Sequence, residues 1–325
     1  MEIEWKARLH SEQFLGQKQS ISLRDAIDQF CDSKRGNASY KSLLCHAQVA
    51  LRLLPVHKPI DQLSSHDLER FKRDRHAEGA APQTIKHNMN LIRGAWKLAR
   101  KYGYQVTEVE FPTLKIPRSP LRYLSHVEEL RLLECLDPKR EGTGLRPFAE
   151  RDDELKRFMQ DAYDLVVLLL DTGARYGEIA NIEWKKIDLD AKSISLWRPK
   201  VQNEAVIFMT SRVHEILVRR YETRNGPYVF TNKKGGPRGY MSQAIRKAIK
   251  HAGLHDCRIH TLRHTHASRL IQNGLSVYEV REVLGHTDIK TTMRYAHLEA
   301  SKVTSKARDV INRLNQQGQE SQSHF

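Results

Sequence analysis

The chain has 325 residues, and a chain of this length is expected to form two domains, because single hydrophobic cores stop growing well before that size. Its formal net charge is +15, and the lysines and arginines are spread along the whole sequence. This distribution favours nucleic acid over a membrane surface as the polyanionic partner, since no single helix or terminal tail holds the basic residues. Charge alone leaves open a basic protein without such a partner.

Short patterns argue against secretion, a membrane span and a disulfide framework. Residues 1–10 hold charged side chains and no apolar core, so they do not form a secretory signal. The apolar run at 165–170 is far shorter than the roughly 20 residues that a helix needs to cross a bilayer. The cysteines are far apart and form no Cys-x-x-Cys pair, which predicts neither a zinc site nor disulfides: Cys31, Cys45, Cys135 and Cys257. We therefore expect a cytoplasmic protein without a membrane partner.

After an N-terminal extension at 1–21, residues 22–103 show the apolar periodicity of a helical domain with polar helix starts. Four helices are predicted, over about 23–33, 39–54, 64–79 and 82–103, and Pro55, Gly79 and Gly103 end the last three. The fourth helix has a basic face that could follow phosphates or could equally be a solvated charged surface: Lys86, Arg93, Lys97, Arg100 and Lys101.

Helical periodicity is lost between 104 and 122, where three prolines alternate with basic residues. Such a segment stays extended and suits a basic interdomain linker. A second domain is predicted over 123–300, followed by a C-terminal helix at about 302–314 within a final segment, 301–325.

Within the second domain, two helices, one following Ser125 and one over about 153–170, flank a Gly- and Pro-containing loop at 138–152. Residues 193–197 and 205–208 are rich in β-branched and aromatic types and predict two short strands, joined by a turn at 199–203. Helices resume at about Ser211. The predicted fold class is therefore mainly α with a small antiparallel β-sheet (α+β).

Four stretches of the second domain supply residue types that phosphoryl transfer needs: cationic donors for the phosphate oxygens, a nucleophile and proton carriers. The first, 172–178, places Arg175 at a turn where a helix has ended at Gly173 and another begins. Its guanidinium could bind a phosphate, or it could be a surface arginine that caps a helix. We interpret Glu178 as a structural partner that orients Arg175 or the backbone.

The second stretch, 260–266, places His260 and Arg263 three residues apart, on one face of a helix and within reach of one small ligand. His264 is interpreted as a core histidine with a hydrogen-bond partner. A zinc site is disfavoured because Cys257 is the one nearby thiol and no His-Glu-x-x-His pattern is present.

The third and fourth stretches, 284–287 and 291–297, place Tyr295 shortly after His286. A tyrosine on an amphipathic helix can simply be a core residue, so this pattern alone does not decide its role.

Together, the four stretches resemble the catalytic domain of the tyrosine recombinase family of phage integrases, Xer-type resolvases and Cre-like enzymes. The resemblance covers about 123–298 and implies six catalytic residues: Arg175, Lys200, His260, Arg263, His286 and Tyr295. It also implies that residues 22–103 form a core-binding domain, that a 3′-phosphotyrosyl intermediate forms without a cofactor or metal, and that four protomers act on two DNA duplexes as clamps.

One departure and two alternatives qualify the subtype. Larger phage integrases begin with a small arm-binding domain, whereas about twenty residues precede the first predicted helix here. A type IB topoisomerase or telomere resolvase would use the same chemistry on one duplex, and a DNA-binding regulator would need no Tyr295. Accessory DNA-bending or directionality factors are further partners that the resemblance implies.

Overall fold

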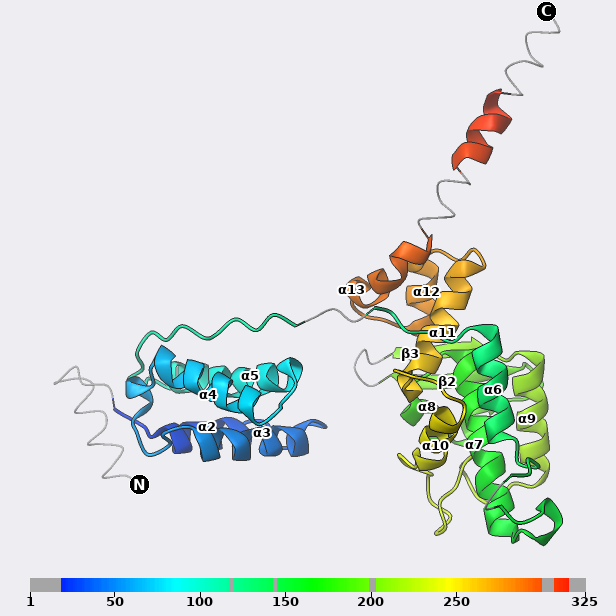
Figure 1. The fold of residues 1–325 in the computed structure, drawn as a ribbon, viewed down its shortest axis with the longest axis horizontal. Helices are drawn as coiled ribbons and strands as arrows, with labels where there is room; N and C mark the ends of the chain where they lie inside the picture. The colour runs from blue at the N-terminus through cyan, green and yellow to red at the C-terminus, as the bar shows by residue number, and fades with distance from the viewer. Residues whose placement is uncertain (1–18, 117–119, 143–144, 199–202, 300–306, 316–325) are drawn as a thin grey trace, which may run out of the picture. The chain divides into compact units, whose positions relative to one another are not determined.

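The computed structural model describes residues 19–116, 120–142, 145–198, 203–299 and 307–315, and the chain divides into two units, Met1–Ser119 and Pro120–Phe325 (Figure 1). Each unit has a hydrophobic core of its own, and each is described by itself.

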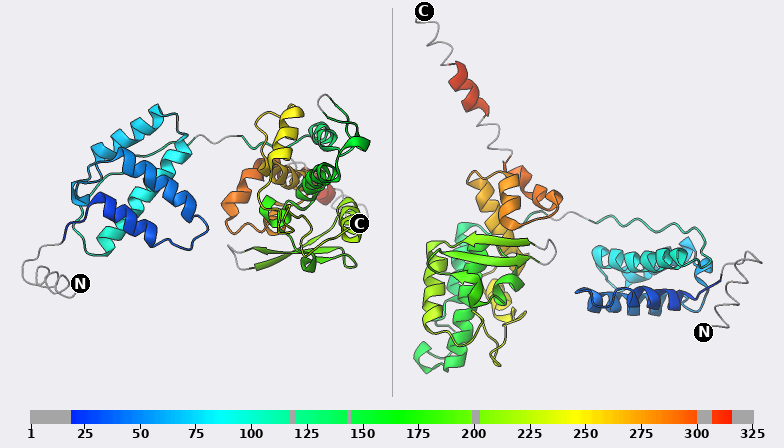
Figure 2. Two further views of the ribbon diagram at one scale, coloured as in Figure 1. Left: turned by 90° about the horizontal axis from the view of Figure 1, so that it is seen from below. Right: turned by 180° about the vertical axis from the view of Figure 1, so that it is seen from behind.

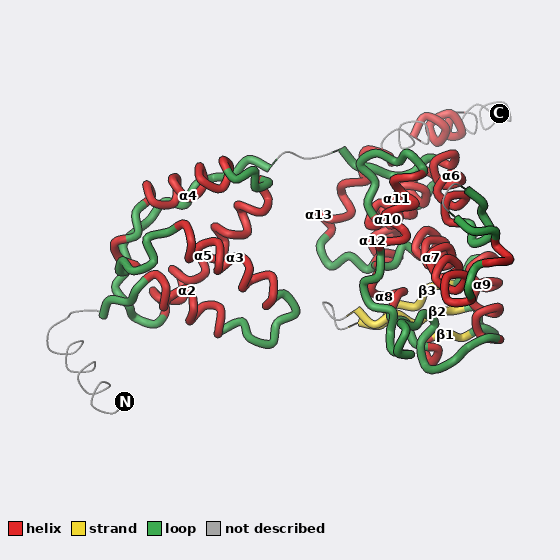
Figure 3. The backbone as a smooth tube through the Cα atoms, turned by 60° about the horizontal axis from the view of Figure 1, so that its bottom comes forward, coloured by secondary structure: helices red, strands yellow, loops and turns green. Residues whose placement is uncertain are grey.

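Over residues 19–116, the first unit has four α-helices and one short 3-10 helix, and α5 packs against the other three α-helices (Figure 3). Local chemistry explains where they begin: the Ser22 and Ser64 side chains accept hydrogen bonds from backbone amides of the first turn, and Pro82 occupies the first turn of α5. The elements are α2 (Leu23–Asp32), α3 (Tyr40–Leu53), η1 (Ile60–Gln62), α4 (Ser65–Ala77) and α5 (Pro82–Lys101).

The segment that follows α5 has no regular secondary structure and lies against the core of the first unit as far as Leu114. The Trp96 indole donates to the Thr107 carbonyl oxygen at 3.1 Å, and the Arg93 guanidinium lies 4.7 Å from the centre of the Phe111 ring. The first half of the predicted linker is therefore attached to the helical unit.

The second unit is built around its long helix α7, which packs against α6, α8, α9, α10 and α11. Its core consists mostly of aliphatic side chains, and residues 165–170 of α7 are all buried in it. None of the described helices is long and apolar enough to cross a membrane. The helices are α6 (His126–Leu136), η2 (Phe148–Glu150), α7 (Asp153–Thr172), α8 (Tyr176–Ala180), η3 (Trp184–Lys186), α9 (Ser211–Glu222), α10 (Gln243–His251), α11 (Ile259–Gln272), α12 (Val277–Leu284), α13 (Ile289–Thr292) and η4 (Met293–Tyr295).

A three-stranded antiparallel sheet lies along one side of these helices (Figure 2). Its strands are β1 (Ile187–Asp188), β2 (Ser193–Arg198) and β3 (Asn203–Phe208), in the order β1-β2-β3. Ile194 and Leu196 point into the core, whereas Trp197, on the opposite face, is exposed.

Buried ion pairs tie α7 to α9 and to a later loop. Asp164 is fully buried and accepts hydrogen bonds from Arg219 at 2.6 Å and Arg220 at 2.7 Å. Asp161, one turn earlier, pairs with Arg220 at 2.7 Å and with the buried Arg238 at 2.8 Å. Removing one partner would leave a buried charge uncompensated, so these pairs fix the register of the helices.

The fold class expected from the sequence is confirmed, since the unit is mainly helical with a small antiparallel sheet. Two details differ from expectation: the two-residue strand β1 was not predicted, and η1 interrupts the stretch between α3 and α4. Residues 307–315 form a helix whose side chains are all exposed, within the predicted C-terminal helix. The predicted hairpin turn lies outside the described residues, except for Asn203.

Candidate active site

The first stretch forms a tight connection between α7 and α8. Gly173 ends α7 with φ of +61°, a conformation that glycine adopts without a Cβ penalty. Arg175 is the N-cap of α8, and both its backbone amide and its Nη1 donate to the Glu178 carboxylate, at 2.8 and 2.7 Å. The expected structural role of Glu178 is confirmed. Because the Arg175 side chain remains 45% exposed, its guanidinium can still bind an anion.

Arg263 is the buried arginine of the site. It is 3% exposed, and its Nη1 and Nη2 donate to the carbonyl oxygens of Gly173, at 2.6 Å, and Leu284, at 2.8 Å. These carbonyls belong to the ends of α7 and α12, so one guanidinium joins three helices, its own α11 included. A side chain held in this way is fixed in position before any ligand arrives.

His266, which the sequence analysis did not single out, packs against the same connection between α7 and α8. Its Nδ1 lies 2.9 Å from the Leu170 carbonyl oxygen near the end of α7. Its ring also packs so closely on Gly173 that a Cβ there would lie 2.5 Å from the imidazole Cδ2. His266 is therefore part of the support for the turn that carries Arg175.

His286 lies in the turn between α12 and α13, where Gly285, with φ of +60°, ends α12. The imidazole Nδ1 is 2.9 Å from the Thr292 hydroxyl, which is buried at the end of α13. This contact fixes the ring orientation of His286 relative to the short turn η4, which begins one residue after Thr292.

Tyr295 is the most deeply buried of the five candidate residues that the structure describes. It is 1% exposed and belongs to a small apolar cluster formed by α11, α12 and the segment that follows. Its hydroxyl lies 2.6 Å from Nδ1 of His264. The interpretation of His264 as a core histidine is wrong in one respect, because the residue is only half buried and its partner is the candidate nucleophile.

The side-chain charges of these stretches act on one another, which shows that the fold brings them together. Partial burial lowers the pKa of His260, and the positive charges of Arg263, Arg175 and Arg294 lower it further. Burial raises the pKa of the Tyr295 phenol to about 12, against the opposing effect of Arg263 and Arg294. The site is therefore electropositive, and its positive charges favour the neutral form of the His260 imidazole.

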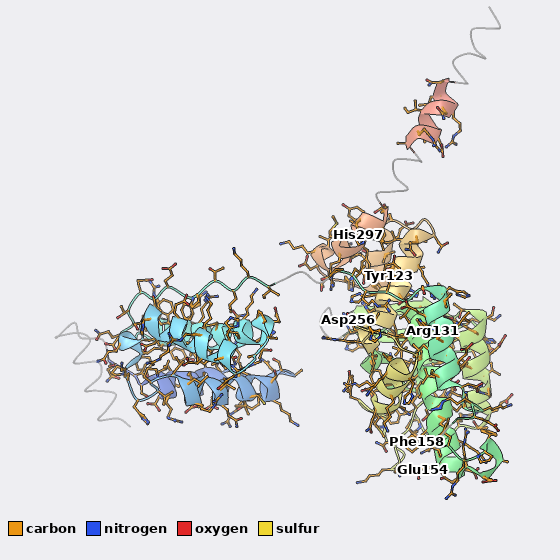
Figure 4. All side chains as sticks on the ribbon, in the orientation of Figure 1. Tyr123, Arg131, Glu154, Phe158, Asp256 and His297 are labelled. Atoms are coloured by element: carbon orange, nitrogen blue, oxygen red, sulfur yellow. The ribbon has the colours of Figure 1, made fainter. Side chains whose placement is uncertain are left out.

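The five described candidate residues lie in the second unit, and Lys200 lies outside the described residues. His297, two residues after Tyr295, is found at the end of this unit that carries α12 and α13 (Figure 4). Phe158 and Glu154 lie at the opposite end of the unit, beside the start of α7. A cavity of about 710 Å³ is lined by Phe158, Lys233 and Arg246 among others, and Phe158 lies at this opposite end.

Comparison with known proteins shows which proteins the chain resembles. The sequence pattern of the Phage integrase family matches residues 150–302, which include every candidate residue. The integrase of Salmonella phage P22 is 28% identical over 251 residues, which cover 71% of this chain and 58% of that protein. The tyrosine recombinase XerC of Xanthomonas campestris pv. campestris (strain B100) is 25% identical, over 74% of this chain and 71% of XerC. Residues 150–302 thus match the Phage integrase family, and the relatives over a larger part of the chain are an integrase and a tyrosine recombinase.

The fold of the tyrosine recombinases agrees with this assignment. The integrase of transposon Tn1549, solved in complex with transposon right end DNA, superposes with a TM-score of 0.68 at 17% sequence identity. The match covers 88% of this chain and 99% of that chain. By contrast, this chain spans less than two thirds of the phage P22 integrase.

The sequence analysis did not place His264 or Arg294 at the site, and each had a weak signal. His264 directly follows Arg263, and helical periodicity does not say which side chain from another segment will meet it. Arg294 precedes Tyr295 and acts on His260, His264 and Tyr295, but an exposed arginine in a helical stretch is common. As a whole, the arrangement presents fixed positive charges and neutral imidazoles around a phenol, which is what in-line attack on a phosphodiester requires.

Proposed function

We propose that this protein is a site-specific DNA recombinase that cleaves and rejoins DNA through a covalent bond between Tyr295 and a 3′-phosphate. The observation that carries the proposal is the convergence of Arg175, Arg263 and Arg294 on His260, beside the sheltered Tyr295. A phosphodiester is the ligand that such fixed donors stabilise best, because its transition state gains charge on the oxygens they face.

In this mechanism, Arg175 and Arg263 bind the non-bridging oxygens of the scissile phosphate, and His286 donates a hydrogen bond to it. The Tyr295 oxygen attacks phosphorus, and Lys200 protonates the leaving 5′-oxygen. The phosphoester energy stays in the phosphotyrosyl bond, so neither ATP nor a metal is required. The 5′-hydroxyl of a second duplex then attacks that bond and completes the strand exchange.

The partner is double-stranded DNA, and the basic face of α5 supplies part of the phosphate contacts. Lys86, Lys97, Arg100 and Lys101 are exposed on this helix, while Arg93 is half buried under Phe111. Four copies of the chain assemble on two duplexes, and the helix at 307–315 is suited to bind a neighbouring copy. Its exposed apolar side chains support this role: Val310, Ile311 and Leu314.

The reaction serves the integration or excision of a phage genome or another mobile element. The names of the relatives support this use, since they include a phage integrase and a transposon integrase. Accessory DNA-bending or directionality factors would set the direction. Relaxation of supercoiled DNA without exchange of strands between duplexes would instead indicate a topoisomerase of type IB.

The test is to trap the covalent intermediate on duplexes taken from the flanks of the protein's own gene. Tyr295→Phe should abolish the adduct and leave DNA binding nearly unchanged, because one hydroxyl is the nucleophile and adds little to phosphate affinity. Tyr278→Phe is the matched control, since Tyr278 lies on α12 and is 69% exposed. An adduct of normal yield from Tyr295→Phe would disprove the assignment of the nucleophile.

A further inference from the structure

The hydroxyl of Tyr295 has an imidazole as its partner, and that imidazole is not His260, the histidine of α11 that the family resemblance places among the catalytic residues. The partner is His264, at 2.6 Å from Nδ1. We propose that His264, and not His260, is the base that takes the proton of Tyr295 when the phosphotyrosyl bond forms. This inference rests on the proposed function and assigns one of its steps.

The geometry separates the two histidines. His264 lies one turn after His260 on α11, and their rings meet edge to face, with centroids 4.7 Å apart and an interplanar angle of 82°. His260 is the more exposed of the two and lies among the charges of Arg175 and Arg263, where a phosphate would bind. A nucleophile and its base need a direct hydrogen bond, and in this structure His264 has one with Tyr295.

The surroundings make His264 a base that only substrate can activate. Burial is the largest cause that lowers the pKa of His264 to about 4, and the neighbouring His260, Arg294, Arg263 and His286 contribute the rest of this shift. These groups come from α11, the α12–α13 turn and η4. A bound phosphate is an anion beside the same cations, so its arrival favours the imidazolium and raises the pKa of His264. Before DNA binds, the phenol keeps its proton.

The proton and electron balance is complete. With its Nε2 protonated, neutral His264 accepts the phenol hydrogen at Nδ1 while the Tyr295 oxygen forms the bond to phosphorus. The bond between phosphorus and the 5′-oxygen breaks, and Lys200 gives that oxygen a proton. In the rejoining step each proton returns by the same path, so the His264 imidazolium protonates the departing Tyr295 oxygen. The phosphate must gain access to the hydroxyl, but the base and the nucleophile are already in contact.

The test compares the DNA cleavage rates of His264→Asn and His260→Asn in the full chain. The substrate is a duplex from the flanks of the protein's own gene, with a nick that traps the covalent adduct. Asparagine is chosen because its side-chain oxygen can replace Nδ1 as a hydrogen-bond acceptor but cannot take a proton. We expect His264→Asn to cleave roughly a hundredfold more slowly at unchanged DNA affinity, which is the usual cost of lost base catalysis. The fall in the wild-type cleavage rate at acid pH should also disappear in His264→Asn.

A more acidic nucleophile shows whether a variant cleaves slowly because it has lost the base or because its structure is disturbed. Trifluorotyrosine at position 295 loses its proton more easily than tyrosine, so it should restore most of the rate of His264→Asn and little of the rate of His260→Asn. Rescue of His260→Asn alone would overturn the proposal and return the proton to His260. Cleavage by His264→Asn at or above the wild-type rate would also overturn it, because the contact would then only shelter Tyr295. If the wild type forms no adduct, the proposed function itself fails.

Discussion

Gly173 is the position at which a single methyl group should affect the candidate site most. An alanine there keeps φ at +61°, which costs about 1 kcal/mol for a residue with a Cβ. The new Cβ would lie 2.5 Å from Cδ2 of His266 and 3.0 Å from Cδ2 of Leu284. The imidazole cannot easily yield, because its Nδ1 is bound to the Leu170 carbonyl, and overpacking of this kind costs about 1–3 kcal/mol. Gly173→Ala should therefore destabilise the second unit by about 2–4 kcal/mol.

Gly253→Ala is the matched control, because Gly253 has φ of +66° and a Cβ there would meet nothing within 4 Å. It should cost about 1 kcal/mol for backbone strain alone. Hydrogen exchange of the α7 and α11 amides, followed by mass spectrometry on the full chain, reports this unit separately from the first. Protection should fall about 5-fold in Gly253→Ala and about 30- to 700-fold in Gly173→Ala, at about 1.4 kcal/mol for each factor of ten. Equal losses in the two variants would refute the argument from His266.

Two further predictions concern charge. Lys200→Ala should slow DNA cleavage about a hundredfold, because the leaving 5′-oxygen loses its acid. A DNA substrate with sulfur at the 5′-bridging position, which leaves as a thiolate without an acid, should restore most of that rate but should not rescue Arg263→Ala. If Lys200→Ala cleaves the ordinary and the sulfur-containing DNA equally slowly, another residue is the acid. The Arg122 guanidinium lowers the pKa of Glu128 to about 2 from 4.5, so the pair stabilises the fold fully above the unfolded pKa, and this contribution is lost as the pH falls through about 2. Glu128→Gln keeps the helix cap with Ser125 and should lower the free energy of unfolding by about 1–2 kcal/mol at pH 7. In urea titrations, this difference from wild type should shrink as the pH falls toward 2. A difference that did not change with pH would contradict the assigned role of the ion pair.

Much of the fold follows from chemistry that acts over a few residues. Ser64, Ser125 and Ser276 each precede an acidic residue at the third helical position, and each begins a helix with a capping box. Gly173 and Gly285 end helices in the left-handed conformation, as their places after apolar runs indicate. For Ser64, Ser125 and Gly173, the sequence analysis predicted the adjoining helix end within about two residues.

Features that depend on distant partners were not predictable in this way. The strand β1 has two residues and exists because β2 pairs with it, so it has no periodicity of its own. The contact of His264 with Tyr295 joins positions 31 residues apart, and the burial of Arg263 depends on carbonyls at the ends of two other helices. The family resemblance named Arg263 and Tyr295 but not His264, because a motif records residue types and not the hydrogen bonds between them.

The cluster that shelters Tyr295 is separate from the main core of its unit. Its buried members come from the second half of α11, from α12 and from η4, whereas the larger core is built around α7. Uncovering Tyr295 breaks the contacts of a few side chains and leaves the core around α7 intact, whereas the end of α12 must keep its place because Arg263 donates to the Leu284 carbonyl oxygen. In the proposed mechanism, the larger core would hold the turn that carries Arg175, and local opening of the small cluster would set when the Tyr295 phenol meets the phosphate.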